Sequence, residues 1–431
     1  MTSLPRMPRM PDAATTLLGS APFGRALVIC IVATAYLSFT VKSTMGWAGL
    51  IAIVATLVVL AAVSIAVRPR DLEWRGLLPI SLLAFVGWSA ISVFWSDYQW
   101  ASLGSIAYQI AFAFLAVYVA LTRDLIQVVR GFGDVLRVLL SGGLVLEILS
   151  GLLLDIPISF LHITGNLGQA GPIQGLFGSR NQLGLVALIA LATFFVEWRT
   201  RSVHRPVAFG SLALAAVMVL LTRSPVTFVA LAVLAIAAIA LRVLRRSTPE
   251  SRRIGQFVLL GSVLLISAVA VAGRVRIVGF LNARTELETR LSLWRGIRRV
   301  VPENSLEGFG WIGYWQPDLP PYIGINPFSG PHQSALSAFV DVSLQLGLVG
   351  LVTFIAFVGL AFVRSWLLAS NKTSVVYLWP ALTLAVLLSV SGVESSALVE
   401  FGWLTLVICG LKASQNLSWR TRLPSEPLPE E

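Results

Sequence analysis

The sequence predicts an all-α protein that crosses a membrane many times. Of its 431 residues, 56% are hydrophobic and 12% are charged, whereas a soluble domain carries about 45–50% apolar and roughly 25% charged residues. A chain with so few charges cannot cover its apolar surface in water, which excludes a soluble enzyme, and its aliphatic content excludes disorder. Because a spanning helix needs about 20 apolar residues, the chain has room for about twelve spans.

Twelve apolar runs follow one another along the chain. They lie at 26–41, 46–67, 76–95, 101–121, 135–154, 182–198, 206–221, 225–241, 254–273, 344–363, 375–392 and 397–411. The first run contains Ala33-Thr34-Ala35 after basic residues, a pattern that signal peptides also show. Because apolar residues continue past this tripeptide and eleven further runs follow, we expect an uncleaved first helix.

The basic residues predict the orientation. If the N-terminus is cytoplasmic and the runs alternate, 22 of the 32 Lys and Arg residues fall on the cytoplasmic side, in seven separate segments. This agrees with the positive-inside rule. It predicts a multi-pass protein of the inner (plasma) membrane with both termini in the cytoplasm.

This topology divides the chain into five parts. The parts are an N-terminal cytoplasmic tail (1–25), nine spans (26–273), one large external loop (274–343), three spans (344–411) and a C-terminal cytoplasmic tail (412–431). The external loop departs from the positive-inside rule, because seven arginines lie between residues 274 and 299. So many arginines on the external side imply a local use for positive charge.

Residues 283–301 of this loop read as a helix. Arg290 and Arg298 fall within its apolar stripe, beside Trp294, at about 100° per residue. A guanidinium there must meet an anion, since an unpaired buried charge is costly. It either reaches lipid headgroups or an acidic neighbour, or it clamps a phosphate or diphosphate, which suits the planar fork of arginine. The apolar stripe itself consists of Leu287, Leu291, Trp294, Ile297 and Val301.

His332 lies in a stretch rich in Pro and Gly, just before the run at 344–363. Its ordinary pKa of about 6.5 suits proton transfer near neutral pH, although loop histidines also serve as surface or capping residues. Neither His332 nor the other two histidines, His162 and His204, has a second ligand-type residue at metal spacing. We therefore predict no metal site.

Two carboxylates lie in or next to apolar runs. Glu147 sits within the fifth run, where a carboxyl group is a functional candidate or is protonated or paired inside the bundle. Glu394 lies at the external end of the eleventh run. It orients an arginine, binds sugar hydroxyls or is solvated.

Several motifs, in this order, resemble the O-antigen ligase and O-antigen polymerase superfamily, which is also similar to exopolysaccharide-polymerising membrane proteins. Arg290-Leu-Ser-Leu-Trp294 resembles its Arg-x-x-x-Trp helix, Gly308-Phe-Gly310 its Gly-x-Gly turn, and His332 its histidine before a Gly-rich span. Weaker similarities lie at 94–97, 176–184 and 222–227. Gln333 stands where the family usually has Asn, and Pro225 interrupts a permuted Ser/Arg/Thr motif. The resemblance implies a ligase-like domain at about 180–365.

The resemblance implies a multi-helical membrane glycosyltransferase, similar to the GT-C class, that works without metal or cofactor. It would transfer a glycan from undecaprenyl diphosphate to an acceptor hydroxyl on the external face, with inversion, during surface polysaccharide biosynthesis. His332 would be the base and Arg290 would neutralise the leaving group. The substrate-binding candidates are Arg180, Arg223, Arg298, Trp294 and Glu394.

The implied partners are the polyprenyl-diphosphate-linked glycan, a glycan or lipid acceptor, the membrane, and a chain-length regulator and flippase. The net charge of +11 reflects cytoplasmic loops rather than nucleic acid. A transporter or flippase of lipid-linked or anionic glycans is the alternative. Transporters tend to show inverted repeats and polar residues at mid-membrane, whereas here polar residues cluster in one external loop. A structural scaffold is disfavoured by the external arginines.

Overall fold

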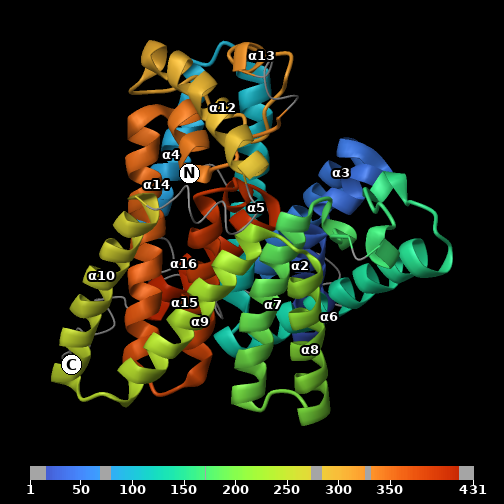
Figure 1. Ribbon diagram of the computed structural model, residues 1–431, viewed down its shortest axis with the longest axis vertical. Coiled ribbons are helices and arrows are strands. Elements are labelled where there is room, and N and C mark those ends of the chain that lie inside the picture. The colour runs from blue at the N-terminus through green and yellow to red at the C-terminus, as the bar shows by residue number, and fades with distance from the viewer. Residues whose placement is uncertain (1–15, 68–78, 170, 273–283, 326–331, 417–431) are drawn as a thin grey trace, which may run out of the picture.

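The computed structural model describes residues 16–67, 79–169, 171–272, 284–325 and 332–416. Over these ranges the chain forms a bundle of α-helices with short 3₁₀ and π turns and no named strand (Figure 1). In chain order the helices are α2 (Ala21–Tyr36), α3 (Ser38–Val67), α4 (Ile80–Ile91), α5 (Gln99–Thr122), α6 (Leu125–Ile148), α7 (Arg180–Thr200), α8 (Arg205–Leu221), α9 (Pro225–Arg246), α10 (Pro249–Ala272), α12 (Arg284–Val300), α13 (Tyr322–Ile325), α14 (Ala338–Asn371), α15 (Leu378–Ser391) and α16 (Glu400–Asn416).

The prediction of an all-α membrane protein is confirmed. Within the described ranges, α3, α5, α7, α9, α14 and α6 with its π-helical extension are long and apolar enough to cross a membrane. Shorter apolar helices are α2, α8, and α4 and α15 with their adjoining 3₁₀ turns. Each predicted apolar run is helical over most of its described length.

Several helix boundaries differ from the prediction. Helix α6 begins at Leu125, ten residues before the predicted start at residue 135. The first run crosses the junction at Leu37, where α2 has ended and α3 has not begun. Helix α14 begins at Ala338, before the predicted start at residue 344. Helix α16 continues beyond residue 411, so Lys412 is a buried helical residue rather than part of a tail. Residues 1–15, 273–283, 326–331 and 417–431 of the predicted tails and external loop lie outside the described ranges.

Serine caps determine where two site-bearing helices begin. Ser179 precedes α7, and its side chain accepts a hydrogen bond from the backbone N–H of Gln182 at 3.2 Å. Ser224 precedes α9, and its side chain accepts from the N–H of Thr227 at 3.2 Å. Such caps satisfy backbone donors that a helix leaves unpaired in its first turn. The residues beside these caps are therefore fixed at helix ends.

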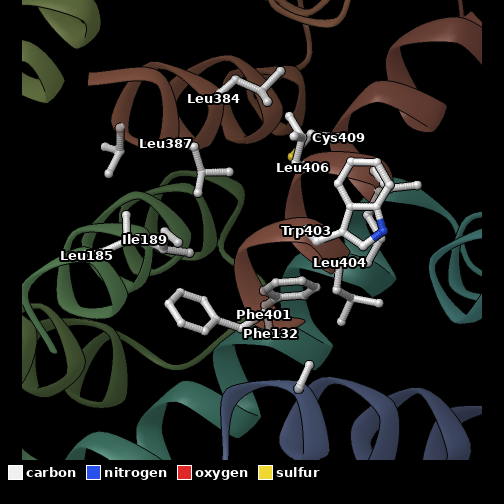
Figure 2. Packing of buried hydrophobic residues seen from close by; sticks show 14 of the residues in the cluster. Phe132, Leu185, Ile189, Leu384, Leu387, Phe401, Trp403, Leu404, Leu406 and Cys409 are labelled. Carbon is white, nitrogen blue, oxygen red and sulfur yellow. The ribbon is translucent and has the colours of Figure 1, made fainter. Parts of the chain in front are cut away.

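The main core takes buried residues from most of the described helices, and Figure 2 shows the part of it that includes Phe132 of α6, Leu185 of α7, Leu384 of α15 and Trp403 of α16. The rings of Phe132 and Phe401 both pack on Tyr36, with centroid distances of 5.9 and 5.0 Å. Trp379 is fully buried, and its indole N–H donates to Thr193 Oγ1 at 2.9 Å. The core therefore joins the two ends of the chain into one bundle.

The described part of the predicted external loop forms a packed layer at one end of the bundle, where α12 and α13 lie (Figure 1). It has a hydrophobic core of its own, in which Leu293 and Ile297 of α12 meet Trp315, Tyr322 and Leu344. The predicted helix at 283–301 is confirmed over its described residues, as α12. The loop side chains are therefore held in defined positions.

Glu147 fastens the segment between α6 and α7 to the bundle. Its Oε1 accepts hydrogen bonds from the backbone N–H groups of Gln174 and Gly175, both at 2.8 Å. Of the two interpretations, the paired carboxyl group inside the bundle is the one observed. These hydrogen bonds fix the chain shortly before α7 begins at Arg180.

Two glycines let the external loop dock on a break in α14. Gly347 has a left-handed backbone (φ 63°) inside the helix, and Gly308 of the loop has φ 71°. The N–H of Gly310 donates to the carbonyl of Gln345 at 2.8 Å, and the N–H of Leu348 donates to the carbonyl of Ser305 at 2.9 Å. The Gly308–Gly310 turn therefore joins the loop to the span that follows.

Replacing Gly308 with alanine is expected to loosen this junction. A Cβ at Gly308 would lie 2.5 Å from backbone atoms of Gln345 and Gly347, and a left-handed non-glycine residue costs about 1–3 kcal/mol. We expect a lower melting temperature of the purified protein and faster proteolysis of the loop. Gly324→Ala is the matched control, because nothing lies within 4 Å of a Cβ there. Equal melting temperatures for both variants would contradict the tight contact.

Candidate functional site

Arg290 is a buried cation at the end of the bundle where α12 and α13 lie. It lies on α12 and is only 7% exposed. Its Nη2 lies 3.1 Å from Glu394 Oε1, its Nε donates to the carbonyl of Val393 at 3.2 Å, and its Nη1 lies 3.4 Å from Glu286 Oε2. The guanidinium is thus held between its own helix and the segment that follows α15.

Arg180 shares a carboxylate with Arg290. As the first residue of α7, Arg180 forms an ion pair with Glu286 of α12. The Arg180 side chain is 36% exposed, against 8% for that of Arg290. Glu286 therefore bridges two arginines from different helices, and Arg180 is the arginine that solution reaches more easily.

Asn181 connects this cluster to α9. Its Nδ2 donates to Glu394 Oε1 at 2.6 Å, and its Oδ1 accepts from the Ser224 hydroxyl at 2.7 Å. The bond joins the residues that follow Arg180 and Arg223, so it brings both arginines to the same end of the bundle. Arg223 is exposed and has a left-handed backbone (φ 46°). We call Arg180, Arg223, Glu286, Arg290 and Glu394 the arginine cluster.

The carboxyl group of Glu394 is buried beside Arg290. Burial raises the pKa of its carboxyl above the usual range, and the attraction of Arg290 and the Asn181 hydrogen bond offset only part of that rise. Of the three interpretations of Glu394, orientation of an arginine is the one that the contacts support. The described cluster holds three arginines against two carboxylates, which suits it to a further anion.

The expected position of Arg298 is wrong. Arg298 is exposed, as is Leu291, and the buried face of α12 is formed by Arg290, Leu293 and Ile297. At about 100° per residue, Ile297 lies within about 20° of Arg290, whereas Arg298 is about 80° away. The packing of Leu293 and Ile297 against the loop core turns Arg298 toward the outside.

His332 lies at the start of a fixed segment. The histidine is half-buried, the carbonyl of its neighbour Gln333 accepts from the Trp315 N–H at 2.9 Å, and Trp294 Nε1 donates to the Ala335 carbonyl at 2.8 Å. Trp294 is half-buried, and its indole N–H points toward the segment that begins with His332. Arg290 and Trp294 thus connect one helix to two different parts of the site.

Asp341 accepts hydrogen bonds from several parts of the site, and the sequence analysis did not identify it. It is fully buried on α14 and accepts hydrogen bonds from Trp315 Nε1 at 2.7 Å, the Ala335 N–H at 3.0 Å and Gln345 Nε2 at 3.2 Å. It also accepts from the Ser395 hydroxyl. In the sequence, the one sign of this role was a single carboxylate just before the apolar run at 344–363. Through Ala335 and Ser395, Asp341 holds the segment that begins with His332 and the segment that contains Glu394 in fixed positions relative to each other.

The family model described as O-antigen ligase matches residues 210–355. The chain carries an O-antigen ligase domain. This match confirms the resemblance to the O-antigen ligase and polymerase superfamily, and it covers Arg223, Arg290, His332 and Asp341. The chain has no significant match among the curated proteins. Its coarse function is accordingly that of a glycosyl-transferring membrane enzyme of surface polysaccharide biosynthesis.

The O-antigen ligase domain contributes only part of the site. Arg180, Asn181 and Glu394 lie outside the matched residues and reach Arg290 or its carboxylate partners through α7 and the segment after α15. Across the described ranges, no group of three or more His, Cys, Asp or Glu side chains is placed to hold a metal ion. Arg223 and Arg290 lie within the matched residues, and guanidinium groups can bind anions directly.

A small cavity of about 60 Å³ lies beside the arginine cluster. Glu394, Gln182 and Ser334 line one part of it, and Tyr314 and Glu400 line another. Ser334 lies two positions after His332. The cavity therefore connects the segment that begins with the histidine to the carboxylate that holds Arg290.

Proposed function

We propose that this protein is a metal-independent, inverting glycosyltransferase of the O-antigen ligase or polysaccharide polymerase type. It transfers a glycan from undecaprenyl diphosphate to an acceptor hydroxyl on the external face of the inner membrane. The observation that carries the proposal is the arginine cluster, in which Arg290 is buried and Arg180 remains accessible. A buried and an accessible arginine beside a histidine segment would supply an anion site and a base.

The donor diphosphate would bind to Arg180 and Arg290, with the exposed Arg223 at the edge. The Arg290 Nη1–Glu286 Oε2 distance of 3.4 Å is longer than an ordinary N–H···O hydrogen bond of about 2.7–3.2 Å. Phosphate oxygens can therefore replace Glu286 as a partner of Arg290, whereas at Arg180 they would have to displace a closer ion pair with Glu286. As the leaving diphosphate gains charge, the two guanidinium groups stabilise it.

His332 would act as the general base. The acceptor oxygen attacks the anomeric carbon from the side opposite the diphosphate, the new C–O bond forms as the bond to the diphosphate breaks, and the acceptor proton passes to His332. A single displacement inverts the anomeric centre. A neutral imidazole accepts a proton readily near neutral pH.

Transport is the competing function, and the two differ in whether a bond is broken. Purified protein in lipid nanodiscs would be given undecaprenyl-diphosphate-linked glycan together with either lipid A core or a second glycan as acceptor. We expect free undecaprenyl diphosphate and an enlarged acceptor, and the acceptor that reacts separates ligase from polymerase. In sealed vesicles, movement of unchanged donor without product would support the flippase instead. A chain-length regulator and a flippase remain proposed partners.

The proposed topology has twelve spans in a GT-C-like arrangement, with both termini cytoplasmic and residues 284–325 external. Ser305→Cys, in a background without Cys30 and Cys409, is expected to react with a membrane-impermeant maleimide on intact cells. Thr248→Cys, between α9 and α10, is expected to react only after permeabilisation. Both positions are exposed, so accessibility depends on the side of the membrane. The opposite labelling pattern would remove the site from the external face.

A further inference from the structure

A cavity of about 180 Å³ lies between the first half of α2 and the start of α6. One water needs only about 10–15 Å³ of such space, so the cavity has room for a larger polar group. The described residues around it include three arginines and neither Asp nor Glu. They are Arg25, Val28 and Ile29 of α2, Arg123 at the end of α5, and Gln127, Arg130 and Gly131 of α6. A cavity with this lining favours an anion.

Helix α5 places this cavity at the opposite end of the bundle from α12 and α13. Tyr98 directly precedes α5, and its hydroxyl lies 3.1 Å from that of Tyr322 in α13, whereas Arg123 directly follows the last residue of α5. The 24 residues of α5 span about 36 Å, which exceeds the hydrocarbon thickness of about 30 Å. The cavity therefore lies at the headgroup level of the membrane leaflet on the other side from α12 and α13.

The guanidinium of Arg123 is held in the cavity wall by α2. Its Nη2 donates to the carbonyl of Ala21 at 2.7 Å. Gly24 makes room for this contact, because a Cβ there would lie 2.9 Å from the same nitrogen. A side chain that is already fixed loses little conformational freedom when a ligand binds. Arg123 therefore provides a preformed positive side to the cavity.

The other two arginines remain accessible. Arg130 is exposed and forms no hydrogen bond or ion pair with the residues that the structure describes. Arg25 is paired with Asp134 at 3.2 Å, but the two side chains are 65% and 40% exposed, and Asp134 also pairs with Arg137 at 2.9 Å. Exposed ion pairs of this kind contribute little stability. Arg25 and Arg130 can therefore both turn toward an anion in the cavity.

An exposed apolar face of α6 continues from the cavity toward the middle of the bundle. Val138 and Val145 are 69% and 53% exposed, and they lie about 80° and 60° around the helix from Arg130. An acyl chain gains free energy from packing on such a face, whereas a soluble phosphate ester has no apolar part to place there. The arrangement of a cationic cavity above an apolar helix face matches the two parts of a phospholipid.

We propose that this cavity binds the phosphodiester headgroup of an anionic phospholipid of the phosphatidylglycerol type. The planar fork of arginine suits phosphate oxygens, and basic pockets between membrane-spanning helices bind anionic headgroups. Phosphatidylcholine carries a cation beside its phosphate, which the three arginines would repel. The site lies at the opposite end of the bundle from the arginine cluster, so the inference does not depend on the proposed function.

Native mass spectrometry of the delipidated protein in neutral detergent would test this site. With phosphatidylglycerol and phosphatidylcholine of equal chain length, wild-type protein should bind the anionic lipid more tightly. Arg130→Gln should weaken that binding about fivefold, and the Arg25→Gln/Arg130→Gln double variant about 25-fold. Arg242→Gln is the matched control, because Arg242 is an exposed arginine of α9 outside the cavity wall. Equal affinity in wild type and the double variant, or an equal loss in Arg242→Gln, would overturn the proposal.

Melting temperatures separate lipid binding from an effect on folding. Without lipid, Arg130→Gln should melt like wild type, because Arg130 has no described partner to lose. Added phosphatidylglycerol should raise the melting temperature of wild type more than that of Arg130→Gln, since a ligand stabilises the folded state to which it binds. An equal rise in both proteins would contradict the site.

Soluble glycerol phosphate distinguishes a lipid headgroup from a free phosphate ester. It presents the same phosphate chemistry without acyl chains, so it should not displace phosphatidylglycerol from wild-type protein at equal concentration. If glycerol phosphate instead binds as tightly as the lipid, and Arg130→Gln weakens both alike, the ligand is a soluble phosphate ester and the lipid proposal is wrong.

Discussion

His332→Ala is expected to lower the turnover of glycan transfer by about 10²–10⁴-fold, because general-base assistance has that size. The base acts only when the new bond forms, so binding of undecaprenyl-diphosphate glycan should be nearly unchanged. Single-turnover assays with saturating donor, together with a donor-binding measurement, would show the separation. Unreacted donor should accumulate on the purified variant.

His332 is half-buried, so its replacement also needs a test of folding. His332→Gln keeps a polar side chain of similar size and should lose turnover as fully as the alanine variant while it retains the wild-type melting temperature. His162→Ala is the matched control, because His162 is an exposed histidine of the other external segment. Normal turnover in His332→Gln would contradict the catalytic role and leave His332 as a structural residue.

Arg290→Lys is expected to lower kcat/KM for the donor by about 10²-fold although the positive charge is kept. Lysine cannot present two parallel donors to a diphosphate, and each hydrogen bond to a charged group contributes about 1.5–3 kcal/mol. Steady-state kinetics at varied donor concentration would measure the effect. Arg295→Lys is the control, since Arg295 is exposed on the same helix.

Arg290→Ala should differ from the lysine variant in stability as well as in donor affinity. It leaves Glu394 and Glu286 without their buried cation, and removing one partner of a buried pair costs about 3–5 kcal/mol. We therefore expect a lower melting temperature for alanine than for lysine. If lysine restores full activity, a point charge suffices and the argument from the arginine fork is wrong.

The sequence predicted the features that depend on local pattern. Apolar runs located the helices, and the 100° step identified Arg290 as a cation on a buried face. The same step misplaced Arg298, because tertiary packing determines which residues of an amphipathic helix form the centre of its buried face. The periodicity of the sequence alone did not determine how α12 is rotated about its own axis, so the predicted apolar stripe and the observed buried face differ.

The partners of Arg290 could not be predicted in the same way. Glu394 lies 104 residues away and Asn181 reaches the same carboxylate from α7, so only the packed bundle brings them together. The role of Asp341 depends on Trp315, Ala335 and Ser395, which are separated along the chain.

The shared carboxylate of Glu286 has a consequence for the rate of the cycle. In the proposed reaction, the released undecaprenyl diphosphate would keep its negative charge, so arginines without an internal anion would retain the spent carrier. Glu286 contacts both Arg180 and Arg290 and can compete for them as the product departs. It would thus act as a built-in competitor that shortens product residence. A steady-state rate that falls in Glu286→Gln while the single-turnover rate is preserved would reveal product release as the step this carboxylate accelerates.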